Sequence, residues 1–337
     1  MKKKINISVV IPSLNGEIHL KDFLIKNLDI IKNTLESETS YKNIELIVVN
    51  DNSSDNTLSF IEDCKKNYSF LICKTNPKQG ACSARNYGVT LNTIQNSDIN
   101  NLNYILFIDN DVLLSEDFFK QAIKYLNTEP FCIACNGIAY YTGEIQDGAK
   151  LIKFKRGFLR FTSNIFNNKL NNNNSLNIPS FGAQGAYFFL KYSDFLELEG
   201  YDETMDPYLL EETDLVYRGL KRGKKSIYAK DVTGYHKVGG TIASKTSKRT
   251  KILSKRNRIY FAWKNLHSKT LFLQHLMFLP ISIFTPFGLR GFIQALPMLK
   301  TAVKLNKKER EFIKINDKEI LNQSKKFEMD ILNRRIK

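Results

Sequence analysis

Short apolar runs alternate with helical patterns over the first third of the chain. Residues 7–11 and 44–49 are apolar runs that end at turn-forming residues, so both predict buried strands. Residues 104–108 predict a further strand of the same kind. Between the first two runs, apolar residues recur at the spacing of one helix face: Leu20, Leu24, Leu28, Ile31 and Leu35. Strand and helix in alternation predict an α/β domain with a mostly parallel central sheet.

Polar residues directly follow each predicted strand. Pro12 follows the first strand, Asp51 the second, and Asp109 and Asp111 the third. In open sheets of this kind, ligands bind outside the carboxyl ends of the strands. We therefore expect these residues to gather at one edge of the sheet.

The tripeptide Asp109-Asn110-Asp111 is the first candidate for chemistry. Mg²⁺ and Mn²⁺ prefer oxygen ligands and are commonly held by one or two carboxylates together with substrate phosphates. The motif therefore predicts a divalent cation and a phosphate-bearing substrate. An Asp pair that only caps a loop is the alternative, and it is the commoner explanation for such a motif on its own.

A second acidic cluster, Glu211-Glu212-Thr213-Asp214, is expected to open a helix. Acids at a helix N-terminus are favourable without any catalytic role. However, the cluster follows Tyr208-Leu-Leu210, which suggests partial burial. Burial raises the pKa of a carboxylate and makes it available as a general base. Both interpretations fit the pattern.

Several motifs occur in a fixed order along residues 5 to about 265. They are Val10-Ile-Pro12, Val49-Asn-Asp51-Asn-Ser-Ser-Asp55, Asn76-Pro-Lys-Gln-Gly80, Ala84-Arg85-Asn86-Tyr-Gly88, Phe107-Ile-Asp109-Asn-Asp111, Gly200-Tyr201-Asp202-Glu203, Glu211-Glu212-Thr213-Asp214-Leu215 with Arg218, His236, and Arg256-Asn257-Arg258. The ordered set resembles the signatures of family 2 glycosyltransferases, in particular bacterial members that build cell-surface polysaccharides. This resemblance implies a GT-A fold, a nucleotide-diphosphate sugar donor and a divalent cation, Mn²⁺ or Mg²⁺.

The resemblance also implies a general base. In that family the second acid of a Glu-Asp pair deprotonates the acceptor hydroxyl, and Glu212 occupies this position. Because Glu replaces Asp, the side chain is one methylene longer. Glu211, Glu212 and Asp214 therefore all stay candidates for the catalytic residue.

For the metal, the resemblance implies Asp111 as the direct ligand and Asp109 as a contact to ribose or to a metal-bound water. His236 resembles a family histidine that joins the metal or the diphosphate, and a structural hydrogen bond is the alternative for it. Lys237 is expected to help hold phosphate.

The remaining donor-site residues are also implied by the resemblance: Pro12, Asn15, Asp51, Gly80 and Arg85. Asp51 would contact the base or ribose, beside a wall shaped by Pro12. For Asp51 the alternative is an Asx-turn that starts the next helix, a role for which Asp55 is the better candidate. For Arg85 the alternative is a solvated helix face.

Charge divides the chain of 337 residues into two parts. Residues 244–337 hold 22 Lys and Arg against 6 Asp and Glu, which equals the whole-chain net charge of +16, so residues 1–243 are neutral overall. We expect residues 1–243 to form the GT-A catalytic domain and residues 244–337 a basic, amphipathic helical region. Within the second part, residues 270–289 carry no charge. Apolar and basic residues together favour an anionic membrane surface.

The uncharged stretch reaches the length of a transmembrane candidate, but Pro280 and Pro286 argue against a continuous span. We expect short interfacial helices, with a helical hairpin packed on the catalytic domain as the alternative. Met1-Lys-Lys-Lys4 precedes only a short strand and is not expected to be a secretory signal. The predicted location is therefore cytoplasmic, peripheral on the inner face of the plasma membrane.

Other familiar patterns are missing. The sequence contains neither G-x-G-x-x-G after the first strand nor a P-loop, which removes support for dinucleotide oxidoreductases and P-loop NTPases. Cys132-Ile-Ala-Cys135 is a single C-x-x-C among five cysteines, so core packing in a reducing compartment is expected. The Asn-rich residues 166–174 predict a surface insertion, with a lid over the donor as the alternative.

Together these features predict a metal-dependent, inverting glycosyltransferase that acts on a lipid-linked saccharide in surface polysaccharide biosynthesis. A soluble glycosyltransferase for protein or free glycan is the first alternative. A basic nucleic-acid-binding or scaffold protein is the second, and we expect no nucleic-acid partner because the basic residues surround the apolar stretch.

Overall fold

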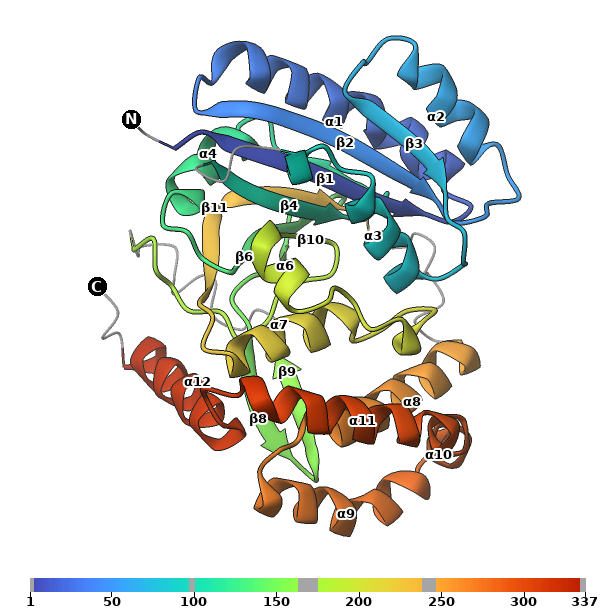
Figure 1. Ribbon diagram of the computed structural model, residues 1–337, viewed down its shortest axis with the longest axis vertical. Coiled ribbons are helices and arrows are strands. Elements are labelled where there is room, and N and C mark those ends of the chain that lie inside the picture. The colour runs from blue at the N-terminus through green and yellow to red at the C-terminus, as the bar shows by residue number, and fades with distance from the viewer. Residues whose placement is uncertain (1–2, 97–100, 163–174, 238–246, 334–337) are drawn as a thin grey trace.

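The computed structural model describes residues 3–96, 101–162, 175–237 and 247–333 (Figure 1). Their strands form one large sheet and a separate two-stranded hairpin. The large sheet contains β1 (Ile5–Ser13), β2 (Tyr41–Asn50), β3 (Leu71–Thr75), β4 (Leu102–Ile108), β5 (Val112–Leu114), β6 (Cys132–Ala139), β7 (Ile145–Asp147), β10 (Tyr187–Lys191) and β11 (Ser226–His236). The hairpin pairs β8 (Leu151–Lys155) with β9 (Phe158–Thr162).

The strand order of the large sheet is β3-β2-β1-β4-β10-β6-β11-β5, with β7 beside β6. β1 pairs in parallel with β2 and β4, β2 with β3, and β6 with β11. β10 is antiparallel to both of its neighbours, β4 and β6. β1, β2, β3, β4, β6 and β11 therefore run in one direction, and the predicted mostly parallel α/β sheet is confirmed.

Helices cover both faces of this sheet. The helices before β11 are α1 (Glu17–Ser37), α2 (Thr57–Lys65), α3 (Ala81–Thr90), α4 (Phe118–Leu126), α6 (Tyr192–Glu197) and α7 (Glu211–Lys221). α1 is the predicted crossover helix, and it buries Leu20, Leu24, Leu28 and Ile31. Together with α2 and α4 it packs on one face of the sheet, while α3, α6 and α7 pack on the other. Side chains that alternate along each strand supply both cores.

The C-terminal helices extend the second of these cores. They are α8 (Lys248–Asn265), α9 (Lys269–Ile283), α10 (Gly288–Ala295), α11 (Leu299–Glu309) and α12 (Asp317–Leu332). Tyr260, Phe261 and Trp263 of α8 are buried in the same apolar cluster as β8 and β9. In Figure 1 these helices lie at the opposite end of the molecule from α1 and α2. α8 is thus an integral part of the same packed body as the sheet.

The uncharged stretch forms α9 and the turn into α10, with Pro280 inside α9. Within the described part of the chain, no helix combines the length and the apolar character needed to cross a bilayer. The proposed domain boundary at residue 243 and the Asn-rich residues 166–174 fall outside the described residues. All five cysteines are buried and free, as the expectation of core packing requires.

Candidate active site

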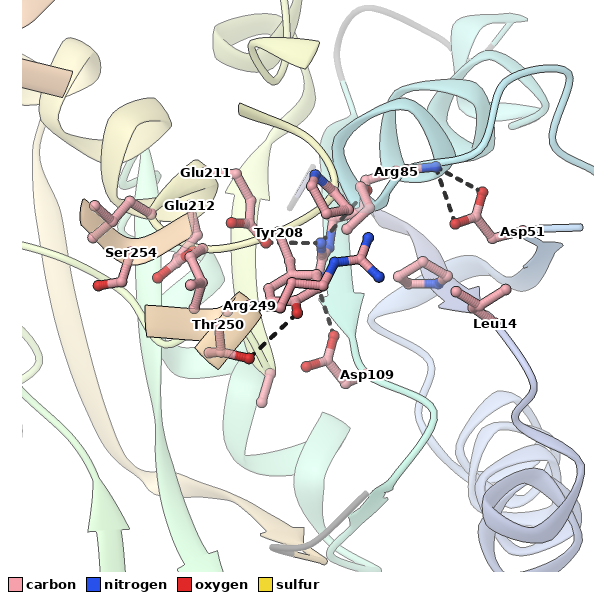
Figure 2. A pocket seen from close by; sticks show the side chains of 18 of the residues that line it. Leu14, Asp51, Arg85, Asp109, Tyr208, Glu211, Glu212, Arg249, Thr250 and Ser254 are labelled. Atoms are coloured by element: carbon pink, nitrogen blue, oxygen red, sulfur yellow. Dashed lines mark hydrogen bonds and ion pairs between the residues drawn. The ribbon is translucent and has the colours of Figure 1, made fainter. Parts of the chain in front are cut away.

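A cavity of about 1230 Å³ opens at the carboxyl ends of β1 and β4 and is closed on its far side by the first turns of α7 and α8. Figure 2 shows Asp51 and Leu14 at one end of the cavity, and Thr250 and Ser254 at the other. Nine of the predicted site residues line it: Pro12, Asp51, Gly80, Arg85, Asp109, Asp111, Glu211, Glu212 and His236. The residues that follow the predicted strands therefore gather at one edge of the sheet, as expected from the sequence.

Asp51 is a buried carboxylate held by fixed donors. The backbone N–H of Gly80 donates to both of its oxygens, at 3.0 and 3.1 Å, and Asn76 Nδ2 donates to Oδ1 at 2.7 Å. Gly80 has φ +150°, and a Cβ there would lie 2.3 Å from the carboxyl group of Asp206, so only glycine fits. Burial raises the pKa of Asp51, and the hydrogen bond from Asn76 opposes this rise.

The start of α2 is held by a different residue, Asp55. Its Oδ1 accepts a hydrogen bond from the backbone N–H of Thr57 at 3.1 Å, and its Oδ2 accepts one from the N–H of Glu17 at 3.1 Å. Asp55 therefore forms the turn that starts α2, as the sequence favoured, and lies one residue before the N-cap Asn56. Asp51 does not start this helix, and its side chain lines the cavity instead.

Arg85 projects from α3 and joins two carboxylates of the cavity. Its Nη2 donates to Asp109 Oδ1 at 2.7 Å, and its Nη1 lies 3.3 Å from Glu211 Oε1. The side chain is only 6% exposed. Burial alone would lower the pKa of Arg85, but the charges of Asp109 and Glu211 raise it above its ordinary value. Arg85 therefore does not lie on a solvent-exposed face of its helix, which was the alternative.

Glu211 and Glu212 open α7 but differ in surroundings. Glu211 is buried, and its Oε2 has no hydrogen-bond partner among the described residues. Burial, followed by the charge of Glu212, raises the pKa of Glu211 to about 7. Glu212 is half-buried and lines the cavity. Its carboxyl group lies beside Gly185, where even a Cβ would approach it to 3.4 Å.

Asp214, the third candidate base, is fully buried and does not line the cavity. Its Oδ2 accepts hydrogen bonds from Arg218 Nε and Lys264 Nζ, both at 2.8 Å, and its Oδ1 accepts one from Asn265 Nδ2 at 2.7 Å. Burial opposes ionisation, but the charges of Lys264 and Arg218 prevail and hold the pKa of Asp214 far below its usual range. Asp214 thus ties α7 to α8.

Asp111 and His236 form a second pair at the cavity floor. His236 Nε2 lies 3.3 Å from Asp111 Oδ1, and this contact, with the charge of Asp109, raises the pKa of His236 even though burial lowers it. Among the described residues, no three His, Cys, Asp or Glu side chains are already gathered into a complete metal site. A cation held by Asp111 and His236 would need further oxygen atoms from a bound ligand, which is how sites with one or two carboxylates and substrate phosphates are built.

Two predicted donor-site residues do not line the cavity. Asn15 uses its Oδ1 to accept hydrogen bonds from the backbone N–H of Ser54 at 2.8 Å and from its hydroxyl at 3.2 Å, which fixes the turn after β1. Lys237 Nζ forms an ion pair with Asp22 at 2.6 Å, while its backbone N–H donates to the carbonyl of Asp111 at 2.9 Å. Both residues therefore support neighbouring elements.

The segment that leads into α7 is strained and held from α8. Leu209 and Leu210 have φ values of +86° and +70°, in the left-handed region that costs a non-glycine residue of order 1–3 kcal/mol. Asn257, which is fully buried, directs Nδ2 to the carbonyls of Met205, Tyr208 and Leu209 at 2.8–3.0 Å. Asn257 therefore fixes the loop that sets the position of the two glutamates.

The wall provided by α8 was not predicted from the sequence. Arg249, Thr250, Lys251, Ser254 and Lys255 line the cavity although they follow the boundary expected at residue 243. The motif Arg256-Asn257-Arg258 was the only signal in this region, and it gave no indication of a cavity wall. The structure shows that this region completes the site.

Comparison with known proteins adds the family context. The family model described as glycosyl transferase family 2 matches residues 8–196. The poly-beta-1,6-N-acetyl-D-glucosamine synthase of Staphylococcus epidermidis is 28% identical over 141 residues, which is 40% of this chain and 32% of that protein. The minor teichoic acid biosynthesis protein GgaB of Bacillus subtilis is 27% identical over 123 residues, 36% of this chain and 12% of that protein. The chain thus matches a third or less of the length of these relatives.

Solved structures resemble the chain over nearly its whole length. GalNAc-T7 with UDP, GalNAc and Mn²⁺ superposes with a TM-score of 0.65 at 14% identity, covering 99% of this chain and 58% of that one. TarS 1–349 of S. aureus in complex with UDP-GlcNAc gives a TM-score of 0.54 at 13% identity, covering 97% of this chain and 89% of that one. At these identities the likeness shows the fold, which is GT-A.

Proposed function

The chain belongs to glycosyl transferase family 2, and we propose that it is a metal-dependent, inverting enzyme that moves a sugar from a nucleoside diphosphate to a hydroxyl of a lipid-linked saccharide. The observation that carries this proposal is that Asp51, the Asp109/Asp111 pair and the Glu211/Glu212 pair line one cavity. Each pair has a separate chemical task in such a transfer. TarS, a structural neighbour, was solved with UDP-GlcNAc, and this supports a nucleotide-sugar donor.

The donor belongs at the end of the cavity that Asp51 occupies. Its carboxylate is fixed by Gly80 and Asn76 and lines the cavity, where it would contact the base or ribose. Pro12 and Leu14 line the same end and offer apolar contacts. The diphosphate would then extend toward Asp109 and Asp111.

The donor atoms of Asp111, Asp109 and His236 suit Mn²⁺ or Mg²⁺, since they combine carboxylate oxygen with imidazole nitrogen. GalNAc-T7 was solved with Mn²⁺, which supports a cation of this class. When bound, the cation would offset the negative charge that develops on the leaving diphosphate. Asp111 and His236 are the direct ligands in this proposal, and Asp109 remains bound to Arg85 while it faces the ribose or a coordinated water.

Glu212 is the proposed general base. It takes the proton of the acceptor hydroxyl while the acceptor oxygen forms a bond to the anomeric carbon from the face opposite the diphosphate. The bond from that carbon to the diphosphate oxygen breaks, and its electron pair leaves with the nucleoside diphosphate. Glu212 fits this role better than Glu211 or Asp214, because Glu211 is buried against Arg85 and Asp214 is bound by Lys264 and Arg218.

The acceptor belongs at the α8 end of the cavity, and its lipid would place the enzyme at the inner face of the plasma membrane. Pro286 and Phe287, which join α9 to α10, line this end. Beyond them the helices expose large apolar side chains: Leu273, Met277, Ile281, Phe284, Leu289 and Ile293. A water-soluble acceptor would give no reason for this surface.

A thermal-shift screen with UDP-, GDP- and dTDP-sugars, each with and without Mn²⁺, tests the proposed function. A ligand present at about 100 times its Kd adds about 2.7 kcal/mol to the free energy of unfolding. We expect one nucleotide class to raise the melting temperature, and to do so more strongly with Mn²⁺. If no nucleotide sugar stabilises the protein under either condition, the proposed function is wrong.

A further inference from the structure

Three basic side chains near the α8 end of the cavity interact electrostatically and lack an acidic partner, and one of them, Lys255, lines the cavity itself. Arg160 is on β9, and Lys255 and Arg258 lie one turn apart on α8. The two elements are in contact, since Phe161 packs edge-on against Phe261 with 6.0 Å between the ring centroids. Within the described part of the chain, no Asp or Glu oxygen lies within 4.0 Å of any of the three charged groups. The sequence segments that flank β9 and α8, residues 163–174 and 238–246, contain no acidic residue either.

Several buried cations of this protein are compensated by carboxylates. Arg218 and Lys264 share Asp214, and Arg222 pairs with Glu309 through two contacts of 2.8 Å. Arg85 pairs with Asp109. Lys221 is instead buried against neutral partners, the carbonyl of Asn265 and the ring of His267, so this fold accommodates a single buried cation in that way. The cluster of Arg160, Lys255 and Arg258 differs because three half-buried cations without a carboxylate partner lie on two contacting elements.

The cluster is electrostatically unfavourable in the empty protein. Burial lowers the pKa of Lys255, and the charges of Arg258 and Arg160 lower it further. Burial also lowers the pKa of Arg258, again with a contribution from Arg160. Lys255 finds only a neutral partner, Thr285, whose hydroxyl lies 3.0 Å from Nζ. A bound anion would reverse this situation, because opposite charge favours the charged form of each group.

The apolar surface lies directly beside these cations. Gly291 of α10 packs so closely on Lys255 that a Cβ would come within 2.5 Å of the lysine Cβ. Gly157, in the β8–β9 turn, lies against the α9 side chain Phe278 and accepts a hydrogen bond at 2.9 Å from His275 Nδ1. Farther along α9 and its C-terminal turn, Met277 is 67% exposed and Phe284 is 89% exposed. A lipid with a negatively charged head and a hydrocarbon chain would match both the basic cluster and the exposed apolar residues beside it.

We propose that Arg160, Lys255 and Arg258 bind the phosphate group of a membrane lipid whose hydrocarbon chain lies along the exposed apolar residues of α9 and α10. Phosphate suits the cluster because arginine guanidinium groups recognise phosphate oxygens in pairs and lysine adds a point charge. The source of the phosphate is either the acceptor lipid or an anionic phospholipid headgroup. The inference rests on the proposed function only for the statement that the acceptor enters at this end of the cavity.

The test compares Arg160→Gln and Arg258→Gln with Lys32→Gln, which removes the same charge from an exposed position on α1 at the opposite end of the molecule. Each full-length variant is floated with three kinds of vesicle. The first is pure phosphatidylcholine, the second contains 30% phosphatidylglycerol, and the third contains about 2% of a long-chain polyprenyl phosphate. Melting temperature without ligand and the thermal shift given by nucleotide plus Mn²⁺ are measured in parallel.

We expect both arginine variants to bind at least one phosphate-bearing vesicle about tenfold or more weakly than wild type, while Lys32→Gln binds as wild type does. If the variants bind more weakly only to vesicles with polyprenyl phosphate, the phosphate belongs to the acceptor lipid. If they bind more weakly to vesicles with phosphatidylglycerol, the phosphate belongs to a phospholipid headgroup. Removing an uncompensated cation should leave the ligand-free melting temperature unchanged or raise it, whereas a structural role would lower it. If all variants bind all vesicles equally, the phosphate site is wrong. The nucleotide shift is read separately, so its absence would refute the proposed function without deciding on this site.

Discussion

Arg85 and Asp109 form a buried ion pair with 2.7 Å between Nη2 and Oδ1, although they stand on different elements, α3 and the end of β4. The same guanidinium reaches Glu211 at 3.3 Å. One cation thus links the predicted metal side of the cavity to the predicted acceptor side. A change at Arg85 should therefore affect both sides together.

Replacement of Arg85 by Met should destabilise the protein, because it leaves Asp109 and Glu211 without their shared counter-charge. Breaking a buried ion pair costs about 3–5 kcal/mol, and the partial exposure of Asp109 places this case toward the lower end. Urea unfolding of the ligand-free protein gives the measurement. Arg85→Lys, which keeps the charge, should recover part of the loss, and equal stability of Arg85→Met and wild type would rule out this role.

Replacement of Glu212 by Gln should lower kcat by roughly 10²–10⁴-fold, which is the usual contribution of general base catalysis. Donor affinity should stay the same, since the base acts on the acceptor. Asp214→Asn is the matched control. It should instead lower the free energy of unfolding by about 3–5 kcal/mol, because buried Arg218 loses its charged partner and Lys264 keeps only Asp202. If Glu212→Gln keeps wild-type kcat, the base must be sought elsewhere.

Glu211 should make stability depend on pH. Its pKa is raised to about 7 from an ordinary value of 4.5, so between these pH values the folded protein holds a proton that the unfolded chain releases. Its contribution is therefore fully present below about pH 4.5 and is lost as the pH rises through about 7. Glu211→Gln stays neutral, so the stability of wild type relative to this variant should fall over that interval. A constant difference from pH 4.5 to 7.5 would contradict the raised pKa.

Asn257 should matter for turnover more than for donor binding. Asn257→Ala removes the donor that serves the carbonyls of Met205, Tyr208 and Leu209, so the strained residues before α7 can relax and shift Glu212. Leaving a buried partner unsatisfied costs about 1–3 kcal/mol, which the melting temperature will report. We expect kcat to fall while the donor KM changes little. A parallel rise in donor KM would show that the loop serves the nucleotide instead.

The sequence predicted the parts of the site that lie directly after strands. Asp51, Asp109 and Asp111 could be placed because apolar runs mark their strands and because parallel strands present their carboxyl ends at one edge. No sequence pattern of this kind predicted the contacts between segments that are distant along the chain. Arg85 and Glu211 are 126 residues apart, and nothing in the spacing of either motif indicates that they meet.

The same limit explains Asp214 and the α8 wall. Asp214 has the composition of a catalytic acid, and only its neighbours Lys264 and Asn265, some 50 residues later, show that it is a structural anchor. Charge counting divided the chain near residue 243, because the net charge changes there. Apolar burial does not follow net charge, and α8 belongs to the core through Tyr260, Phe261 and Trp263.

Calorimetric titration with uridine diphosphate, in the presence and absence of Mn²⁺, tests the central claim most directly when wild type is compared with Asp111→Asn. The amide keeps the shape of the side chain but loses the charge that would hold the cation beside His236. We predict that Mn²⁺ tightens nucleotide binding to wild type by tenfold or more and leaves binding to Asp111→Asn unchanged, while the two proteins share the same far-UV circular dichroism spectrum. An equal Mn²⁺ effect in both proteins would contradict the assignment of Asp111 as the ligand that joins metal and donor.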